Sequence, residues 1–165
     1  MDYTRNSDLK YYETNRTEVN CGSYALRLNE WYDLDTVFED RMGYYIDEWI
    51  SEKGKEGYSD YEISTMYGDI LVEAMLEDMA DELEQCDGAP PTTDDEELIA
   101  FCTFCYCEDT KWPDFDYHFK VFRNGKWMEK IGTGPVHECD EFDWGDYIGD
   151  VTYFYHKLKN NDYEM

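Results

Sequence analysis

Hydrophobic positions in the first half of the chain recur with a helical period. Between residues 59 and 85, apolar side chains return every three or four positions with Asp and Glu between them, which predicts one face of a long amphipathic helix. The expected core positions are Ile63, Met66, Tyr67, Ile70, Leu71, Ala74, Met75, Met79 and Leu83. Further helices are predicted over residues 20–31, where Asn20 can cap the first turn, and over 35–51, followed by the loop EKGKEG.

The pattern changes after DGAPPTTDD at 87–95, because two prolines and a glycine cannot continue the predicted helix. LIAFCTFCYC at 98–107 combines aromatic and small apolar residues, which favours a central strand. YHFKVFR and KWMEKI flank Asn124-Gly125, the strongest short signal for a tight hairpin. A last strand is predicted over residues 151–158.

Helices followed by antiparallel strands predict one α+β domain over residues 1–165. Within it, an acidic helical middle segment is expected at about 56–97. Residues 1–19 are polar and rich in tyrosine, and are interpreted as an arm or short strand packed on the domain.

The charge is strongly one-sided: 40 Asp and Glu residues against 14 Lys and Arg residues give a net charge of −26. With 42% hydrophobic and 18% aromatic residues the chain has enough apolar material for a core, so the charge lies on a folded surface. Such a surface repels nucleic acid and anionic membranes and attracts cationic partners. Neither direct nucleic-acid binding nor membrane binding is therefore expected.

No Lys, Arg or His occurs between Lys55 and Lys111, so the middle of the chain forms the acidic face. Two interpretations stand: a solubilising surface, or a surface that imitates nucleic acid and occupies a basic host protein. The second describes a non-enzymatic inhibitor of a host defence or nuclease protein, of the anti-restriction or anti-CRISPR type.

No apolar run is long enough to span a bilayer, and the first residues lack the basic and apolar segments of a secretion signal. We therefore expect a cytoplasmic protein, in which the six cysteines are reduced. The cysteines at 102, 105 and 107, with His137 and Cys139, could suggest zinc. Strand alternation separates Cys102 from the other two and favours core packing, so neither a metal nor another cofactor is expected.

Cys21, in the stretch NCGSYAL, is either a small buried residue or a nucleophile at the start of a helix. A nucleophile needs a base nearby, and His118, on the strand before the predicted turn, is the candidate. If Asn124 and Gly125 form a two-residue turn, Arg123 pairs with Lys126. Counting back, His118 faces Ile131 and shares a sheet face with Glu129 as a diagonal neighbour, roughly 5 to 8 Å away at Cβ. Glu129 could then orient the imidazole.

This arrangement resembles the papain-like cysteine hydrolases, especially their NlpC-like branch of peptidases and amidases. NCGSYAL is similar to the motif that begins their cysteine-bearing helix, and DYHFKVFRNGKWMEKIG is similar to their histidine hairpin. Glu129 stands near a position where His, Asn or Asp is more usual. The combination of the two motifs is also similar to that of small uncharacterised proteins from phages and their hosts. This similarity favours the fold but does not indicate a substrate.

The resemblance implies Cys21 as nucleophile, His118 as general base and Glu129 as orienter, with an oxyanion hole formed by backbone amides at Cys21 and Gly22 and by the side chain of Asn20. His137 is a reserve orienter. These roles describe a cytosolic thiol hydrolase or acyl-transfer enzyme, phage-encoded or active in phage-host conflict, with a protein or peptide substrate of cationic character. The alternative for His118 and Glu129 is a plain cross-strand pair on the surface.

Overall fold

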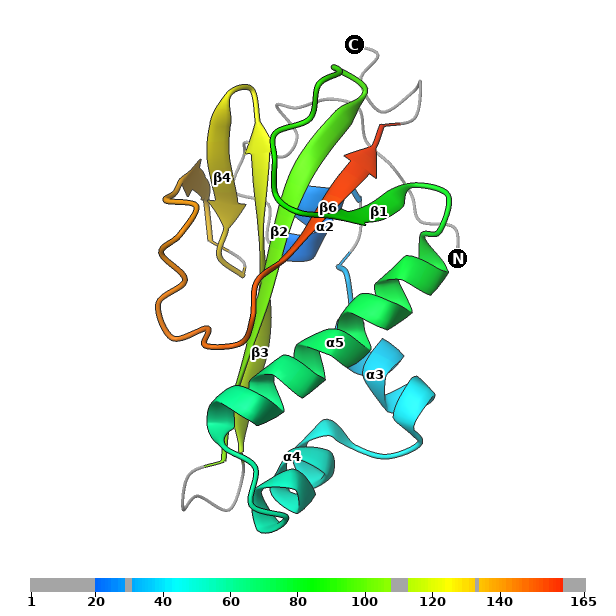
Figure 1. The fold of residues 1–165 in the computed structure, drawn as a ribbon, viewed down its shortest axis with the longest axis vertical. Helices are drawn as coiled ribbons and strands as arrows, with labels where there is room; N and C mark the ends of the chain where they lie inside the picture. The colour runs from blue at the N-terminus through cyan, green and yellow to red at the C-terminus, as the bar shows by residue number, and fades with distance from the viewer. Residues whose placement is uncertain (1–19, 29–30, 108–112, 133, 159–165) are drawn as a thin grey trace.

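The protein is an α+β structure in which N-terminal helices pack on an open six-stranded antiparallel sheet (Figure 1). The computed structural model describes residues 20–28, 31–107, 113–132 and 134–158. The arm predicted at 1–19 lies outside these residues. The strand order in the sheet is β1-β6-β2-β3-β4-β5.

The described elements follow the predicted order of helices first and strands second. The helices are α2 (Cys21–Leu26), α3 (Leu34–Met42), α4 (Ile46–Lys55) and α5 (Asp60–Asp78). The strands are β1 (Leu83–Cys86), β2 (Glu96–Tyr106), β3 (Asp114–Arg123), β4 (Lys126–Lys130), β5 (Val136–Glu138) and β6 (Thr152–Lys157).

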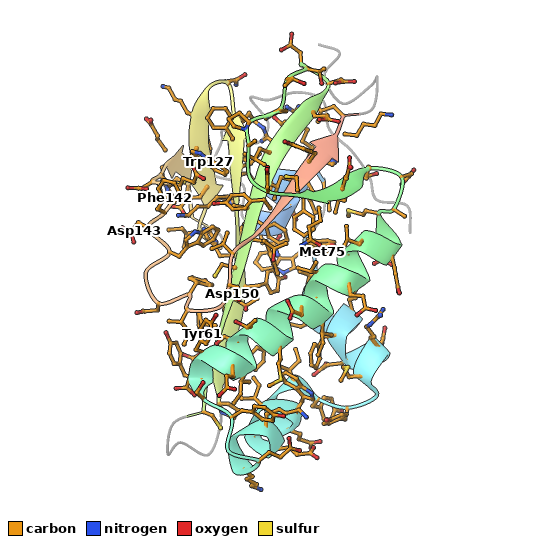
Figure 2. All side chains as sticks on the ribbon, in the orientation of Figure 1. Tyr61, Met75, Trp127, Phe142, Asp143 and Asp150 are labelled. Atoms are coloured by element: carbon orange, nitrogen blue, oxygen red, sulfur yellow. The ribbon has the colours of Figure 1, made fainter. Side chains whose placement is uncertain are left out.

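Helix α5 confirms the strongest periodic signal, but it is shorter than predicted. A capping box between Ser59 and Glu62 begins it, and its apolar face is buried, including Met75, which points toward the sheet (Figure 2). The helix ends at Asp78, and Leu83 begins β1 by pairing with β6. The prediction of helix up to residue 85, and of a helical segment over 56–97, is therefore wrong, because backbone pairing with a distant strand competes with the local period.

The two other helical predictions differ from the structure in different ways: the helix predicted at 20–31 is shorter, and the one predicted at 35–51 is two helices. Arg27 adopts the left-handed conformation, with φ of 58°, and ends α2 well before residue 31. Gly43, with φ of 80°, divides the predicted helix at 35–51 into α3 and α4. Helix α4 then continues to Lys55, so most of the predicted EKGKEG loop is helical.

The strand predictions agree better with the structure. β2 lies inside the sheet, β6 falls within 151–158, and Asn124 and Gly125 both have positive φ, as a two-residue hairpin turn requires. The register pairs Lys120 with Glu129, as expected. β4 ends at Lys130, so the predicted partner Ile131 lies beyond the strand. The edge strand β5 was not predicted, because its three residues carry no alternation to recognise.

The helices and the loop between β5 and β6 lie against different faces of the sheet. Gly22 of α2 approaches Phe119 so closely that an added Cβ would lie 3.1 Å from its ring, and 2.8 Å from the ring of Tyr32. On the other face the Lys120 ammonium donates to the carbonyl oxygens of Asp140 and Asp143, both at 2.6 Å. These bonds hold the loop over the strand face that carries His118 and Glu129.

The far end of the same loop is tied to the helical layer. The Tyr61 hydroxyl at the start of α5 donates to a carboxylate oxygen of Asp150 at 2.5 Å, and the two side chains point toward each other (Figure 2). Thr65 Oγ1 accepts from the Asp150 amide at 3.2 Å. The loop therefore spans both layers of the fold.

A buried ionic cluster fastens α2 to the sheet. Glu97 accepts from Arg27 at 2.9 Å and from Arg123 at 2.7 Å, and Arg123 also donates to the carbonyl oxygens of Tyr24 and Ala25. Burial opposes ionisation of Glu97, but the two guanidinium groups outweigh it and lower its pKa to about 2. The cluster fixes the position of α2 and, through it, that of Cys21.

Within the described parts of the chain, none of the helices combines the length and the apolar character that crossing a membrane requires.

Candidate functional site

The site lies where β3 extends past its pairing with β4. The last pair of that ladder is Lys120 with Glu129, so the preceding part of β3 has no β4 partner beside it. The start of α2 lies against this segment, and Cys21 Sγ lies 4.0 Å from the carbonyl oxygen of Tyr117. Cys21 is 6% exposed. The open strand edge allows a residue from the helical layer to approach His118.

Asn20 fixes the first turn of α2. Its Oδ1 accepts from the amide and the hydroxyl of Ser23, at 2.9 and 2.8 Å, and its Nδ2 donates to the carbonyl oxygen of Tyr32 at 2.8 Å. The side chain is thereby engaged in the helix cap and in the segment that follows the helix. The amides of Cys21 and Gly22 belong to the same first turn, where helical geometry supplies no acceptor.

His118 lies between Cys21 and Glu129, as the hairpin register predicted for the carboxylate. Its Nε2 is 2.6 Å from Glu129 Oε1. Burial lowers the pKa of His118, but hydrogen bonds with the side chains of Cys21 and Glu129, together with their charges, raise it from 6.5 to about 9. The thiol and the carboxylate on either side of the imidazole therefore favour its protonated form.

Glu129 is shared between two imidazoles. Its Oε2 is 2.8 Å from His137 Nε2, and β5 places these two residues directly opposite each other. Burial raises the pKa of Glu129, but the contacts with His118 and His137 outweigh burial and lower it. The His137 side chain is 42% exposed, against 8% for that of His118. A series of contacts thus runs from the buried thiol to the surface.

Two aromatic residues of the β5–β6 loop, which the sequence did not single out, enclose His118. The ring of Tyr147 lies 5.5 Å from the imidazole, and the ring of Trp144 lies 6.1 Å away in an edge-on arrangement. The Tyr147 hydroxyl contacts Asp116 Oδ2 at 3.1 Å. Trp144 also lies over the Lys120 ammonium, 4.2 Å from Nζ to the ring centroid. Only the path of the loop brings these residues to the site, and the loop has no periodic signal.

Of the other cysteines, Cys102 lies directly opposite His118 in the pairing of β2 with β3, whereas Cys105, Cys107 and the third histidine lie away from His118. Cys102 Sγ contacts the carbonyl oxygen of Gly149 at 3.2 Å, Cys105 is fully buried, and Cys107 Sγ is 3.7 Å from the carbonyl oxygen of Ile50. Buried His156 contacts Glu82 at 3.2 Å. Over the residues that the structure describes, no group of three or more His, Cys, Asp or Glu side chains has an arrangement that could hold a metal ion.

No model of a known protein family matches the chain, and neither a curated protein nor a solved structure matches it.

Proposed function

We propose that the protein is a papain-like thiol hydrolase or acyl-transfer enzyme in which Cys21 is the nucleophile, His118 the general acid and base, and Glu129 the orienter. The observation that carries this proposal is the position of His118 between the Cys21 side chain and Glu129, with 2.6 Å from Nε2 to the carboxylate. The other ring nitrogen is then free for the sulfur. This is the arrangement of a nucleophile, a base and a group that orients the base.

The raised pKa of His118, which favours the protonated ring, suits this chemistry. An imidazolium beside a sulfur is the pairing from which papain-type enzymes deliver a thiolate nucleophile. Glu129 supports the cationic ring from the other side, and His137 holds Glu129 in turn. Trp144 and Tyr147 lie beside the ring, whose side chain is 8% exposed, and low exposure to water strengthens these electrostatic interactions.

The reaction follows the order of acyl transfer. The Cys21 sulfur attacks the carbonyl carbon of an amide or thioester, and the carbonyl π electrons move onto oxygen. As the intermediate collapses, the bond to the leaving group breaks and His118 gives that group its proton. Water, or an acceptor amine, then attacks the acyl-cysteine with His118 as base, which releases the acyl product and restores the thiol.

The negative charge on the intermediate's oxygen requires donors near the sulfur. We assign this role to the backbone amides of Cys21 and Gly22, in the first turn of α2. Asn20 is assigned the positioning of that turn, because its own amide nitrogen donates to Tyr32. The close packing of Gly22 on Tyr32 and Phe119 supports this assignment, since a side chain there would displace the turn.

Labelling with iodoacetamide at about pH 6, followed by peptide mapping, tests the nucleophile. Ordinary thiols are protonated and slow at this pH, so Cys21 is expected to react at least about tenfold faster than the other cysteines. His118→Gln should remove that advantage, and Cys21→Ala should remove the labelled peptide.

Cys139→Ala is the matched control, because Cys139 is a partly exposed thiol whose burial and acidic neighbours raise its pKa to about 11. This variant should label at Cys21 like the parent. Equal or slower labelling at Cys21, in protein whose circular dichroism and thermal unfolding are unchanged, would contradict the proposal.

A second candidate function is the non-enzymatic nucleic-acid mimic. The observation that favours it is the exposed row of carboxylates on α5, formed by Glu62, Asp69, Glu73 and Glu77. Arg41 of α3 pairs with Glu73 and Glu77. Between Lys55 and Lys111 the sequence itself contains no basic residue. Such a surface could occupy a site that normally holds phosphates.

Mimicry predicts capture of a DNA- or RNA-binding protein from a bacterial lysate, with binding that weakens as salt rises and that duplex DNA displaces. Capture should persist in Cys21→Ala, which separates this function from catalysis. A lysate that yields no nucleic-acid-binding protein argues against mimicry.

A further inference from the structure

A cavity of about 590 Å³ lies at the end of the sheet where α4 meets β3. It is lined by Glu39 of α3, by Tyr45, Asp47 and Glu48 at the start of α4, and by Pro113 and Phe115. In Figure 1 this is the end of the long strands near which α3 and α4 lie. The volume falls in the range of small-ligand sites, roughly 300 to 1,000 Å³. None of the residues described above for acyl transfer lines it.

Among the residues that the structure describes, the lining combines apolar walls with carboxylates and includes no basic side chain. Glu39 accepts from the Ile46 amide at 3.2 Å and Asp47 from the Glu48 amide at 2.9 Å, so backbone bonds hold both side chains in place. In the described part of the chain, none of the three carboxylates forms an ion pair. The described part of the lining therefore presents negative charge to a cation.

The negative charge continues from the cavity toward the proposed catalytic residues. Asp35 and Glu39 stand four positions apart on α3, which places them on one side of the helix. Burial, together with the charges of Asp33, Asp116 and Glu39, raises the pKa of Asp35 to about 6, although its Tyr67 contact opposes the shift. Burial contributes most to this shift, and the contributions of Asp33, Asp116 and Glu39 show that carboxylates gather around Asp35.

We propose that this cavity binds the side chain of an arginine or lysine in a peptide substrate. Tyr45 and Phe115 would pack against its aliphatic stem and attract its cationic head, while Glu39, Asp47 and Glu48 would receive its N–H groups. A guanidinium fits best, because its planar fork can bind two carboxylate oxygens at once. That the bound peptide is a substrate rests on the proposed function, whereas the binding of its basic side chain does not.

The spacing suggests where the basic residue lies in the peptide. Phe115 lies on the face of β3 that meets the helical layer, against Tyr67, two residues before Tyr117, whose carbonyl oxygen Cys21 Sγ contacts. Two residues correspond to about 7 Å at the rise of an extended strand. The basic side chain should therefore lie about two residues from the bond that Cys21 attacks.

The experiment uses the full chain with Cys21→Ala, so that no turnover interferes, and follows backbone amide signals by NMR. The probes are two capped pentapeptides, Gly-Gly-Arg-Gly-Gly and the same peptide with norleucine in place of arginine. The arginine peptide is expected to shift the signals of Tyr45 and Phe115 saturably. The norleucine peptide should bind at least about tenfold more weakly, because it lacks the charge.

Glu48→Gln is the informative variant, because Glu48 is an exposed residue of the cavity lining and takes part in none of the ion pairs among the described residues. It should weaken binding of the arginine peptide by about three- to tenfold. Glu84→Gln is the matched control: it removes an exposed Glu of β1 that lines a second cavity, where Lys157 already supplies a cation. This control should leave binding unchanged.

Three results would overturn the proposal: equal affinity for the two peptides, shifts that avoid the cavity residues, or equal weakening by Glu48→Gln and Glu84→Gln. The last result would mean diffuse attraction to the acidic surface. Failure of the proposed function would give a different result: iodoacetamide would show no preference for Cys21, while the arginine peptide would still bind.

Discussion

His118 is the residue whose environment differs most from that of a surface imidazole. It is buried, and it contacts a carboxylate that a second histidine also contacts. Burial alone would keep the ring neutral. The contacts with Cys21 and Glu129 reverse that effect and raise the pKa of His118 to about 9.

The expected consequence is a pH-dependent stability. Because the folded pKa lies above the unfolded value of 6.5, His118 contributes its full stabilisation below about pH 6.5 and loses it as the pH rises through about 9. The contribution is at most about 3 kcal/mol. An NMR titration of the His118 ring should give a midpoint near 9, and Glu129→Gln should move it toward 6.5.

His118→Gln provides the thermodynamic control. Its free energy of unfolding, measured by urea denaturation, should depend less on pH between 6.5 and 9 than that of the parent. A His118 midpoint at or below 6.5 in the parent would mean that burial dominates and that the acidic neighbours are weaker than the geometry indicates.

The hairpin shows what local chemistry can determine at the scale of elements. Asn124 and Gly125 adopt the positive φ values of a two-residue turn, and this turn fixes the register that places Glu129 beside the path of His118. The relation between these two residues could therefore be predicted from the sequence. The contact of His137 with the same carboxylate could not, because it depends on β5, whose three residues have no recognisable pattern.

The attachment of α2 to the sheet depends on Glu97. A helix of six residues has little stability of its own, and Arg27 and Arg123 connect it to β2 and β3 through this one carboxylate. Because the folded pKa of Glu97 is about 2, below the usual 4.5, its stabilisation is present above about pH 4.5 and is lost as the pH falls through about 2.

Glu97→Gln should therefore lower the free energy of unfolding at pH 7 by about 3 to 5 kcal/mol, because it leaves two buried guanidinium groups without their anion. Urea denaturation followed by circular dichroism measures the change. Glu84→Gln, at an exposed position of β1, should cost less than about 0.5 kcal/mol. A loss below about 1 kcal/mol in Glu97→Gln would mean that α2 is held mainly by apolar packing.

At the scale of the whole molecule, the net charge of −26 is a source of self-repulsion. The like charges lie closer together in the folded chain than in the unfolded chain, so repulsion destabilises the folded state. Salt screens this repulsion, with a Debye length of about 10 Å at 0.1 M and about 3 Å at 1 M.

Raising sodium chloride from about 20 mM to about 500 mM should therefore increase the melting temperature by several degrees. Asp69→Asn removes one exposed charge of α5 and should reduce this increase slightly. Differential scanning calorimetry measures both. A melting temperature that falls with added salt would show that attractive ion pairs outweigh the repulsion.

By itself the sequence determined the α+β order of helices and strands, the buried face of α5, the interior position of β2 and the hairpin register, because each depends on periodicity or turn chemistry within a short segment. The tertiary structure alone decided the rest. It converted residues 83–86 into a strand through pairing with β6, opened the edge of β3 beside Cys21, and brought His137, Trp144 and Tyr147 to His118. These features depend on contacts between residues far apart along the chain, which no local pattern encodes.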